Sequence, residues 1–243
     1  MMQGMSSGLV NSCTAFCAFE RTKRKHSLAD SSEFFIEQML HLFSLLHAVG
    51  FMYLRGDDQS EHLIDHHERQ RYRVDGPGGN LRHMAVIGVV SEQERESLET
   101  SVRKHWPHMV NNWIVSAIMK RQAQGGLAVP PPFLSSSLAQ LNAAMTSMMH
   151  AKKINDTPFP FPLAQLVTSL LLLFNFTAPV FIAAEVDNLF IVMFLCLLTS
   201  MCSASLNEVA VEVEDPFGFD ANDIELSSLH NRFNERLRQL QND

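Results

Sequence analysis

Two long stretches without a charged residue lie almost next to each other in the second half of this chain. Residues 163–182 read LAQLVTSLLLLFNFTAPVFI, and residues 188–206 read NLFIVMFLCLLTSMCSASL. Each has about twenty residues, the length at which an α-helix crosses the roughly 30 Å hydrocarbon core of a bilayer. Glu185 and Asp187 are the only charges between them. The sequence therefore predicts a transmembrane helical hairpin, with a buried hairpin inside a soluble protein as the alternative.

The basic residues around the hairpin predict its orientation. Lys152 and Lys153 precede the first stretch, and the connector holds neither Lys nor Arg. Because Lys and Arg accumulate on the cytoplasmic side of membrane helices, we expect both ends of the hairpin in the cytosol. The chain is thus predicted to be an integral membrane protein, and a plasma membrane or an organelle membrane fits equally well.

Hydrophobic periodicity predicts further helices before the hairpin. Apolar residues recur at three- and four-residue steps over 33–54, which is typical of an amphipathic helix. A short exposed helix is expected over 91–104, because acidic residues occupy the first turns of that segment. Two more helices are expected over 113–121, ending at Gly125-Gly126, and over 135–153, after Pro130-Pro131-Pro132. The polar, histidine-rich stretch 57–84 contains a glycine-rich loop.

An acidic segment follows the hairpin and turns at Pro216 and Gly218. Seven carboxylates gather there: Glu208, Glu212, Glu214, Asp215, Asp220, Asp223 and Glu225. Crowded like charges repel unless a cation or basic groups compensate them. Their oxygens suit a hard cation such as Ca²⁺, although the twelve-residue EF-hand pattern is absent. A calcium site and a solvated acidic loop both remain open on these residues.

Several other functions find little support. A net charge of −7 argues against a general nucleic-acid binder, and no Ser/His/Asp order or acid pair in an apolar pocket suggests catalysis, so we predict that the chain is not an enzyme. His62, His66 and His67 invite a metal site, with a polar surface helix as the alternative.

Taken together, the residues on both sides of the hairpin resemble the bestrophin family. The resemblance is carried by KKINDTPFPFPLAQLV at 152–167 and NEVAVEVEDPFGFDANDIELSSL at 207–229, with weaker similarity in the passage from Gly125-Gly126 to Pro132. It implies an all-α membrane protein with a bestrophin-like helical protomer, assembled as a homo-pentamer. The implied function is an anion channel subunit that passively conducts chloride or other monovalent anions, with bicarbonate as a second candidate.

The resemblance also implies roles for particular residues. Val129 matches the apolar residue of the cytosolic pore aperture. Asp220 and Asp223 match side-chain ligands of the calcium clasp found in animal bestrophins, Asp215 matches a backbone-carbonyl ligand, and Glu212 stands where those proteins have an amide. Ca²⁺ is therefore the expected cofactor, although bacterial relatives carry a similar acidic segment without calcium gating.

Four segments follow from pattern and resemblance combined. They are an N-terminal segment of uncertain structure (1–32), a cytosolic helical domain (33–156), the transmembrane hairpin (157–206), and an acidic C-terminal segment with a helix (207–243). The first membrane helix and the neck-lining helix of the family are expected before Glu20-Arg21, where only about twenty unremarkable residues stand. A non-conducting membrane scaffold or a truncated subunit with the same fold is therefore the alternative function.

Overall fold

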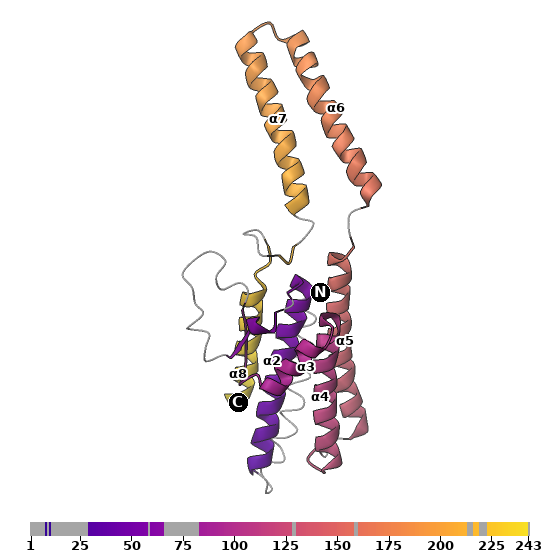
Figure 1. Ribbon diagram of the computed structural model, residues 1–243, viewed down its shortest axis with the longest axis vertical. Helices are drawn as coiled ribbons and strands as arrows, with labels where there is room; N and C mark the ends of the chain where they lie inside the picture. The colour runs from indigo at the N-terminus through magenta and orange to yellow at the C-terminus, as the bar shows by residue number, and fades with distance from the viewer. Residues whose placement is uncertain are drawn as a thin grey trace. The chain divides into compact units, whose positions relative to one another are not determined.

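The described residues of the chain fall into two compact units. In the computed structural model these residues are 8, 10, 29–57, 59–65, 83–127, 130–157, 160–212, 216–218 and 223–242. Unit 1 combines Met1–Ile154 with Ile224–Asp243, and unit 2 is Asn155–Asp223. The all-α prediction is confirmed, since helices dominate both units and the described strands are two short ones (Figure 1).

Unit 1 is built around one long buried helix. Its elements are α2 (Ala29–Arg55), η1 (Ser60–His62), β1 (Leu63–Asp65), β2 (Met84–Val86), α3 (Glu92–Thr100), η3 (Arg103–His105), α4 (Trp106–Ala123), α5 (Pro131–Asn155) and α8 (Leu226–Asn242). Helix α2 packs against α4, α8 and β2. Its side chains Met39, Phe43 and Leu46 are fully buried. Each such side chain contributes about 1.5–3 kcal/mol to folding by leaving water.

Helix α2 is also long and apolar enough to cross a membrane, but most of its apolar stretch is buried inside unit 1. Val110, Ile114 and Ile118 of α4 recur at four-residue steps and are fully buried, which places an apolar stripe on this neighbouring helix. We therefore treat α2 as a core helix, as its amphipathic pattern predicted.

Several boundaries differ from the sequence prediction. Helix α4 begins at Trp106 rather than at 113, because Pro107 lies in its first turn, where the missing N–H costs no hydrogen bond. Helix α5 likewise begins at Pro131 rather than at 135. Helix α3 ends at Thr100, and residues 103–105 form a separate 3₁₀ turn. The capping box between Ser91 and Glu94 fixes the start of α3.

The polar stretch before α3 contains two strands that the sequence did not predict. Strands β1 and β2 pair in parallel, with Leu63 opposite Met84 and Asp65 opposite Val86. Three residues are too few for an alternating pattern to be read from sequence. His62 lies in a 3₁₀ turn and its Nδ1 is 2.6 Å from Asp57 Oδ2, while His66 and His67 lie outside the described residues.

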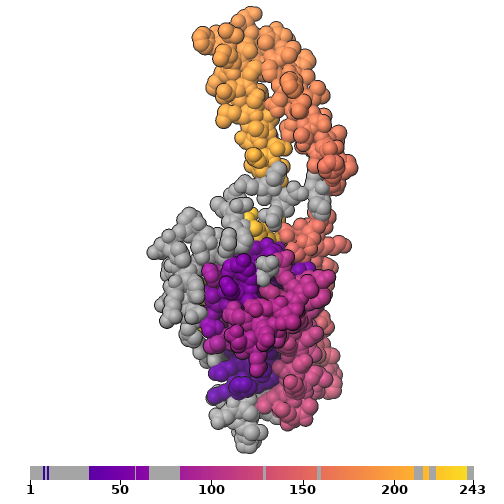
Figure 2. Space-filling model, in the orientation of Figure 1, coloured from indigo at the N-terminus to yellow at the C-terminus, as the bar shows by residue number. Residues whose placement is uncertain are grey.

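Unit 2 is a helical hairpin. Helices α6 (Phe161–Glu185) and α7 (Leu189–Glu212) pack against each other and are joined by residues 186–188. Asn188 caps α7, since its Oδ1 accepts a hydrogen bond of 3.0 Å from the Phe190 N–H. Both helices have the length and composition of membrane spans, and most of their bulky apolar side chains are exposed. Figure 2 shows the two helices in orange, with their side chains at the surface.

The C-terminal part of the chain is divided differently from the predicted segment 207–243. Helix α7 continues to Glu212 within unit 2, whereas α8 belongs to unit 1. The reason is the apolar face of α8, where Leu226, Phe233 and Leu237 are almost fully buried and pack with α2 and β2. Hydrophobic burial thus joins the end of the chain to its N-terminal half.

Candidate functional site

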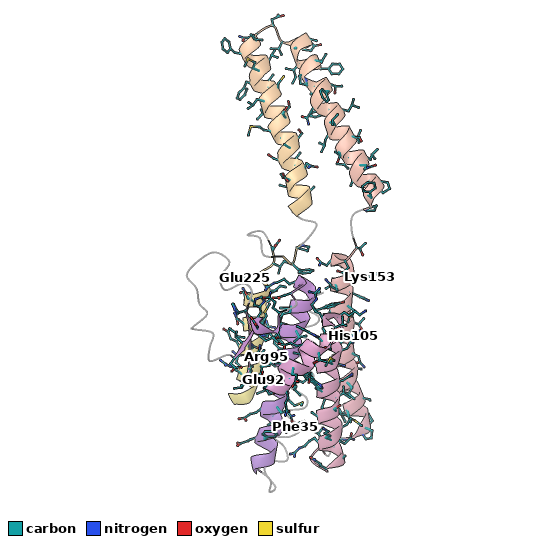
Figure 3. All side chains as sticks on the ribbon, in the orientation of Figure 1. Phe35, Glu92, Arg95, His105, Lys153 and Glu225 are labelled. Atoms are coloured by element: carbon teal, nitrogen blue, oxygen red, sulfur yellow. The ribbon has the colours of Figure 1, made fainter. Side chains whose placement is uncertain are left out.

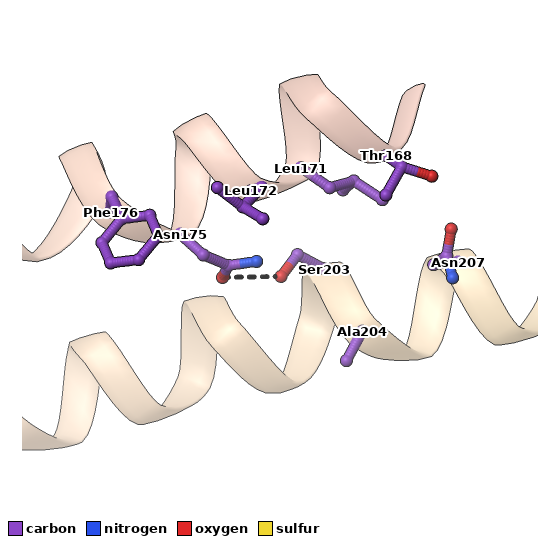
Figure 4. Close-up of a pocket in the computed structure, with 8 residues that line it drawn as sticks. All are labelled: Thr168, Leu171, Leu172, Asn175, Phe176, Ser203, Ala204 and Asn207. Atoms are coloured by element: carbon purple, nitrogen blue, oxygen red, sulfur yellow. Dashed lines mark hydrogen bonds between the residues drawn. The ribbon is translucent and has the colours of Figure 1, made fainter. Parts of the chain in front are cut away.

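Polar side chains form a seam between the two apolar helices of unit 2. Thr168 and Asn175 of α6 face Ser203 and Asn207 of α7 (Figure 4). Asn175 lies two helical turns after Thr168, and Asn207 one turn after Ser203, so each pair shares a helix face. The Ser203 hydroxyl donates a hydrogen bond of 3.1 Å to Asn175 Oδ1. These residues line a cavity of about 360 Å³ together with Leu171, Leu172, Phe176 and Ala204.

The seam fits helices that pack inside a membrane. Ser203 is only 7% exposed and is the one buried side chain among the described residues of the hairpin. A polar group in hydrocarbon is costly without a partner, and hydrogen bonds between membrane helices contribute about 0.6 kcal/mol each. Pro179 has no N–H, so it cannot donate the usual helical hydrogen bond to the backbone carbonyl of Asn175. Asn175 therefore has a backbone carbonyl, as well as its side chain, that needs a hydrogen-bond partner in the membrane. The seam thus fixes the register of the hairpin.

A second polar cluster is buried in unit 1, where α8 meets α2 and β2. The Ser44 hydroxyl of α2 donates to Asn234 Oδ1 at 2.7 Å and accepts the Ile87 N–H at 3.0 Å. The Asn234 amide donates in turn to the Ala85 carbonyl of β2. Ser44 and Asn234 are 0% and 2% exposed, so these hydrogen bonds replace those that water would make.

Two histidines extend the cluster. His230 Nε2 lies 2.9 Å from the Ala85 carbonyl, so this nitrogen carries a hydrogen and donates. With that hydrogen on Nε2, the Nδ1 atom of His230 accepts from His47 Nδ1, 2.9 Å away. The His47 ring stacks on Phe233 with centroids 4.0 Å apart. Burial and the neighbouring His230 hold the pKa of His47 well below its ordinary value, so the ring is neutral at neutral pH.

A third histidine, His41 of α2, has a carboxylate rather than an imidazole as its neighbour. His41 Nδ1 lies 2.7 Å from the Ile87 carbonyl, and its Nε2 lies 3.2 Å from Glu94 Oε1 of α3. Burial alone would lower the pKa of His41, but the hydrogen bonds to Glu94 and Ile87 outweigh it and raise that pKa. Burial alone would raise the pKa of Glu94, but hydrogen bonds from His41 and Ser91 lower it. The pair therefore forms an ion pair between α2 and the capping box of α3.

Most of the site residues predicted from sequence lie outside the described residues. Val129, Asp215 and Asp220 are among them. Glu212 ends α7 and only its backbone is described, while Asp223 is half-buried. The turn predicted at Pro216 and Gly218 is confirmed over 216–218. Among the described residues, no three His, Cys, Asp or Glu side chains are grouped as metal ligands would be.

The buried cluster of unit 1 was not predicted from the sequence. Its partners are far apart, since 190 positions separate Ser44 from Asn234 and 183 separate His47 from His230. One signal was available: all four polar residues interrupt an otherwise apolar helix face, and His230 and Asn234 do so one turn apart. Buried polar groups of this kind are normally paired with one another.

Comparison with known proteins agrees with this architecture. The sequence profile described as Bacterial/Fungal Bestrophin protein matches residues 58–239. The voltage-dependent anion channel-forming protein YneE of Salmonella typhi, and the protein of the same name from Salmonella typhimurium, are 26% identical over 155 residues, which cover 62% of this chain. This chain spans about half of those relatives, 48% of their length.

Solved structures show the same fold. Two crystal structures of variants of a bacterial bestrophin homologue from Klebsiella pneumoniae align with TM-scores of 0.66 and 0.67 at 15% sequence identity. The first alignment covers 100% of this chain and 80% of that one, and the second covers 98% and 78%. Because the family profile matches most of the chain, including all of α3 to α7, the protein belongs to the bacterial and fungal bestrophin family.

Proposed function

We propose that this chain is a subunit of a homo-pentameric anion channel that passively conducts chloride or other monovalent anions. In this proposal α6 and α7 cross the bilayer, and unit 1 is the cytosolic domain. The observation that carries the proposal is the hairpin: none of the apolar stretch of α6 and only 6% of that of α7 is buried, within a chain of the bestrophin family. Water would be a poor solvent for two such helices, whereas lipid would satisfy them.

The proposal is tested by anion flux. The full chain is purified in detergent, reconstituted into chloride-loaded vesicles, and assayed by chloride efflux after a potassium ionophore sets the potential. Efflux above that of protein-free vesicles supports conduction. Membrane-inserted protein that gives no efflux would instead support the alternative, a non-conducting scaffold with the same fold.

We propose that Val129 lines the cytosolic aperture of this pore. A ring of aliphatic side chains sets a dehydration barrier, so Val129→Ala should change the relative permeability of anions that differ in hydration, such as chloride and thiocyanate. The measurement is the reversal potential under bi-ionic conditions. Leu127→Ala, at a buried neighbouring position, serves as the control. Permeability ratios identical to those of the unsubstituted channel would remove Val129 from the aperture.

The topology of the hairpin gives a second prediction. With both ends cytosolic, Asn155 and Asp187 lie on opposite sides of the membrane. In a background without native cysteines, Asn155→Cys and Asp187→Cys should react with an impermeant maleimide from opposite faces of sealed vesicles. Labelling of both positions from one face would contradict the hairpin topology.

The calcium proposal concerns the acidic segment. We propose that Asp220 and Asp223 bind Ca²⁺ with a backbone oxygen near Asp215 and with Glu212 close by. Support comes from the crowding of these acids along the sequence and from the turn at 216–218 between them. An ion that binds only the folded form adds about 2.7 kcal/mol of stability at a hundredfold excess over its dissociation constant.

Thermal unfolding in detergent tests the calcium site. Ca²⁺ should raise the Tm, Mg²⁺ should do so much less, and Asp220→Asn/Asp223→Asn should abolish the shift. Glu99→Gln, an exposed acid on α3, is the control for a general charge effect. If Ca²⁺ leaves the Tm of the unsubstituted protein unchanged, the segment is a solvated acidic loop and not a calcium site.

A further inference from the structure

A groove runs across unit 1 between α2, α3 and α4. It encloses about 720 Å³, within the range of pockets that hold drug-sized ligands. Aromatic side chains and two cations line it, namely Phe34, Phe35, Trp113, Lys120 and Arg121, together with polar residues of the three helices. None of the residues that line the groove belongs to the hairpin seam or to the residues proposed for the pore and for calcium.

The two cations of the groove are consecutive residues of α4. The Arg121 guanidinium carbon lies over the Phe35 ring, 5.6 Å from its centroid, and Lys120 is exposed beside it. In Figure 3 the labelled Phe35 lies near the start of α2, next to the last turn of α4. A cation over an aromatic face is held by the ring quadrupole, so the Arg121 head is oriented rather than freely rotating.

Gly126 leaves room for this arrangement. A Cβ atom at Gly126 would lie 2.3 Å from Arg121 Nε and 2.8 Å from its guanidinium carbon. Such contacts are too short, so any larger residue at 126 would push the Arg121 side chain out of its position. The glycine and the Phe35 ring thus hold the guanidinium between them.

The rest of the lining is mixed: the apolar and aromatic side chains lie beside the polar Gln38, Ser116 and Gln124. Phe34 is 69% exposed although it is a large aromatic side chain, and Trp113 is half-buried. Glu94 also lines the groove, but its carboxylate is compensated by His41 and by the Ser91 cap. The exposed Lys120 therefore brings positive charge next to this aromatic surface.

We propose that this groove binds an amphipathic monocarboxylate, with the carboxylate at Arg121 and Lys120 and the apolar tail along Phe34 and Trp113. The planar guanidinium matches a carboxylate in geometry, and the contact is charge-assisted. The aromatic side chains then remove the tail from water. A carboxylate without a tail would leave the aromatic surface in water, and a tail without a carboxylate would form no charge-assisted contact with the cations. The groove therefore favours a molecule that carries both groups.

Trp113 provides a direct test, because bromine quenches indole fluorescence on contact. The full chain in lipid nanodiscs is titrated with 11-bromoundecanoate, and 11-bromo-1-undecanol serves as the same tail without the charge. Saturable quenching by the carboxylate, much weaker quenching by the alcohol, and loss of the saturable part in Trp113→Phe are expected. The other tryptophan, Trp106, is 3% exposed and should stay unquenched.

Two substitutions examine the anionic end. Arg121→Gln removes the charge, and Gly126→Ala keeps it but displaces the guanidinium. Each should raise the half-quenching concentration about tenfold, the equivalent of one charge-assisted hydrogen bond. Lys104→Gln, an exposed cation outside the groove, should leave that concentration unchanged.

Three results would overturn the proposal. The first is equal quenching by carboxylate and alcohol, which would mean simple partition of the tail into lipid. The second is an unchanged half-quenching concentration in both Arg121→Gln and Gly126→Ala. The third is quenching that arises only after the assembled protein is dissociated, which would assign the groove to contact with a second copy of the chain.

Discussion

Replacing His230 by leucine is expected to lower the free energy of unfolding of unit 1 by about 1–3 kcal/mol. The substitution removes the acceptor for His47 Nδ1 in a fully buried place, whereas the Ala85 carbonyl keeps the hydrogen bond from the Asn234 amide. A polar atom that loses its partner in the core costs about 1–3 kcal/mol, because water cannot replace the partner. Leucine fills part of the volume, so the loss is mainly one of hydrogen bonding.

The double substitution His47→Leu/His230→Leu separates pairing from packing. If the Nδ1–Nδ1 hydrogen bond carries the coupling, the double variant should lose less stability than the sum of the two single variants, since no imidazole is then left without its counterpart. Additive losses would mean that the two rings act independently. His105→Leu, at an exposed position, should change stability by less than about 0.5 kcal/mol and is the control.

Urea unfolding followed by tryptophan fluorescence is a suitable measurement. The two tryptophans, Trp106 and Trp113, are both in α4. The signal therefore reports on unit 1 and not on the hairpin. An unchanged urea midpoint in His230→Leu would contradict the role assigned to the cluster.

The stability of unit 1 should pass through a maximum as the pH is varied. Burial and His230 depress the pKa of His47, so below its ordinary pKa of 6.5 the unfolded chain binds more protons than the folded protein. Stability then falls by about 1.4 kcal/mol per pH unit for this group as the pH decreases. The His47→Leu/His230→Leu variant should show a shallower decline between pH 6.5 and 4.5.

The alkaline side of the maximum depends on His41. Its pKa is raised by Glu94 and Ile87 against the effect of burial, so its contribution is complete below pH 6.5 and is lost as the pH rises through the folded-state pKa. The pKa of Glu94 is lowered, so its own contribution is present above its ordinary value of 4.5 and is lost as the pH falls through the folded-state pKa. His41→Gln should flatten the alkaline limb. A limb of unchanged slope would mean that other groups govern it.

Local sequence patterns were enough to predict the apolar hairpin and the family, whereas the predicted starts of α4 and α5 came too late in the chain. Charge-free length is a local property, and a helix that must cross hydrocarbon can be recognised without knowing what it packs against. The start of α3 was equally readable, because the Ser91–Glu94 capping box is closed within one turn. The roles of Val129 and of the acids around Asp220 came from resemblance and stay predictions.

The elements that surround α2 could be identified only in the folded protein. Length and composition alone would allow this helix to cross a membrane, and its burial by α4 and α8 makes it a core helix instead. Three contacts depend on residues brought together from distant positions. They are the pairing of His47 with His230, the ion pair of His41 with Glu94, and the contact of Arg121 with the Phe35 ring. Such contacts leave no local pattern, because what fixes them is the shape of the packed core and the need to pair every buried polar atom.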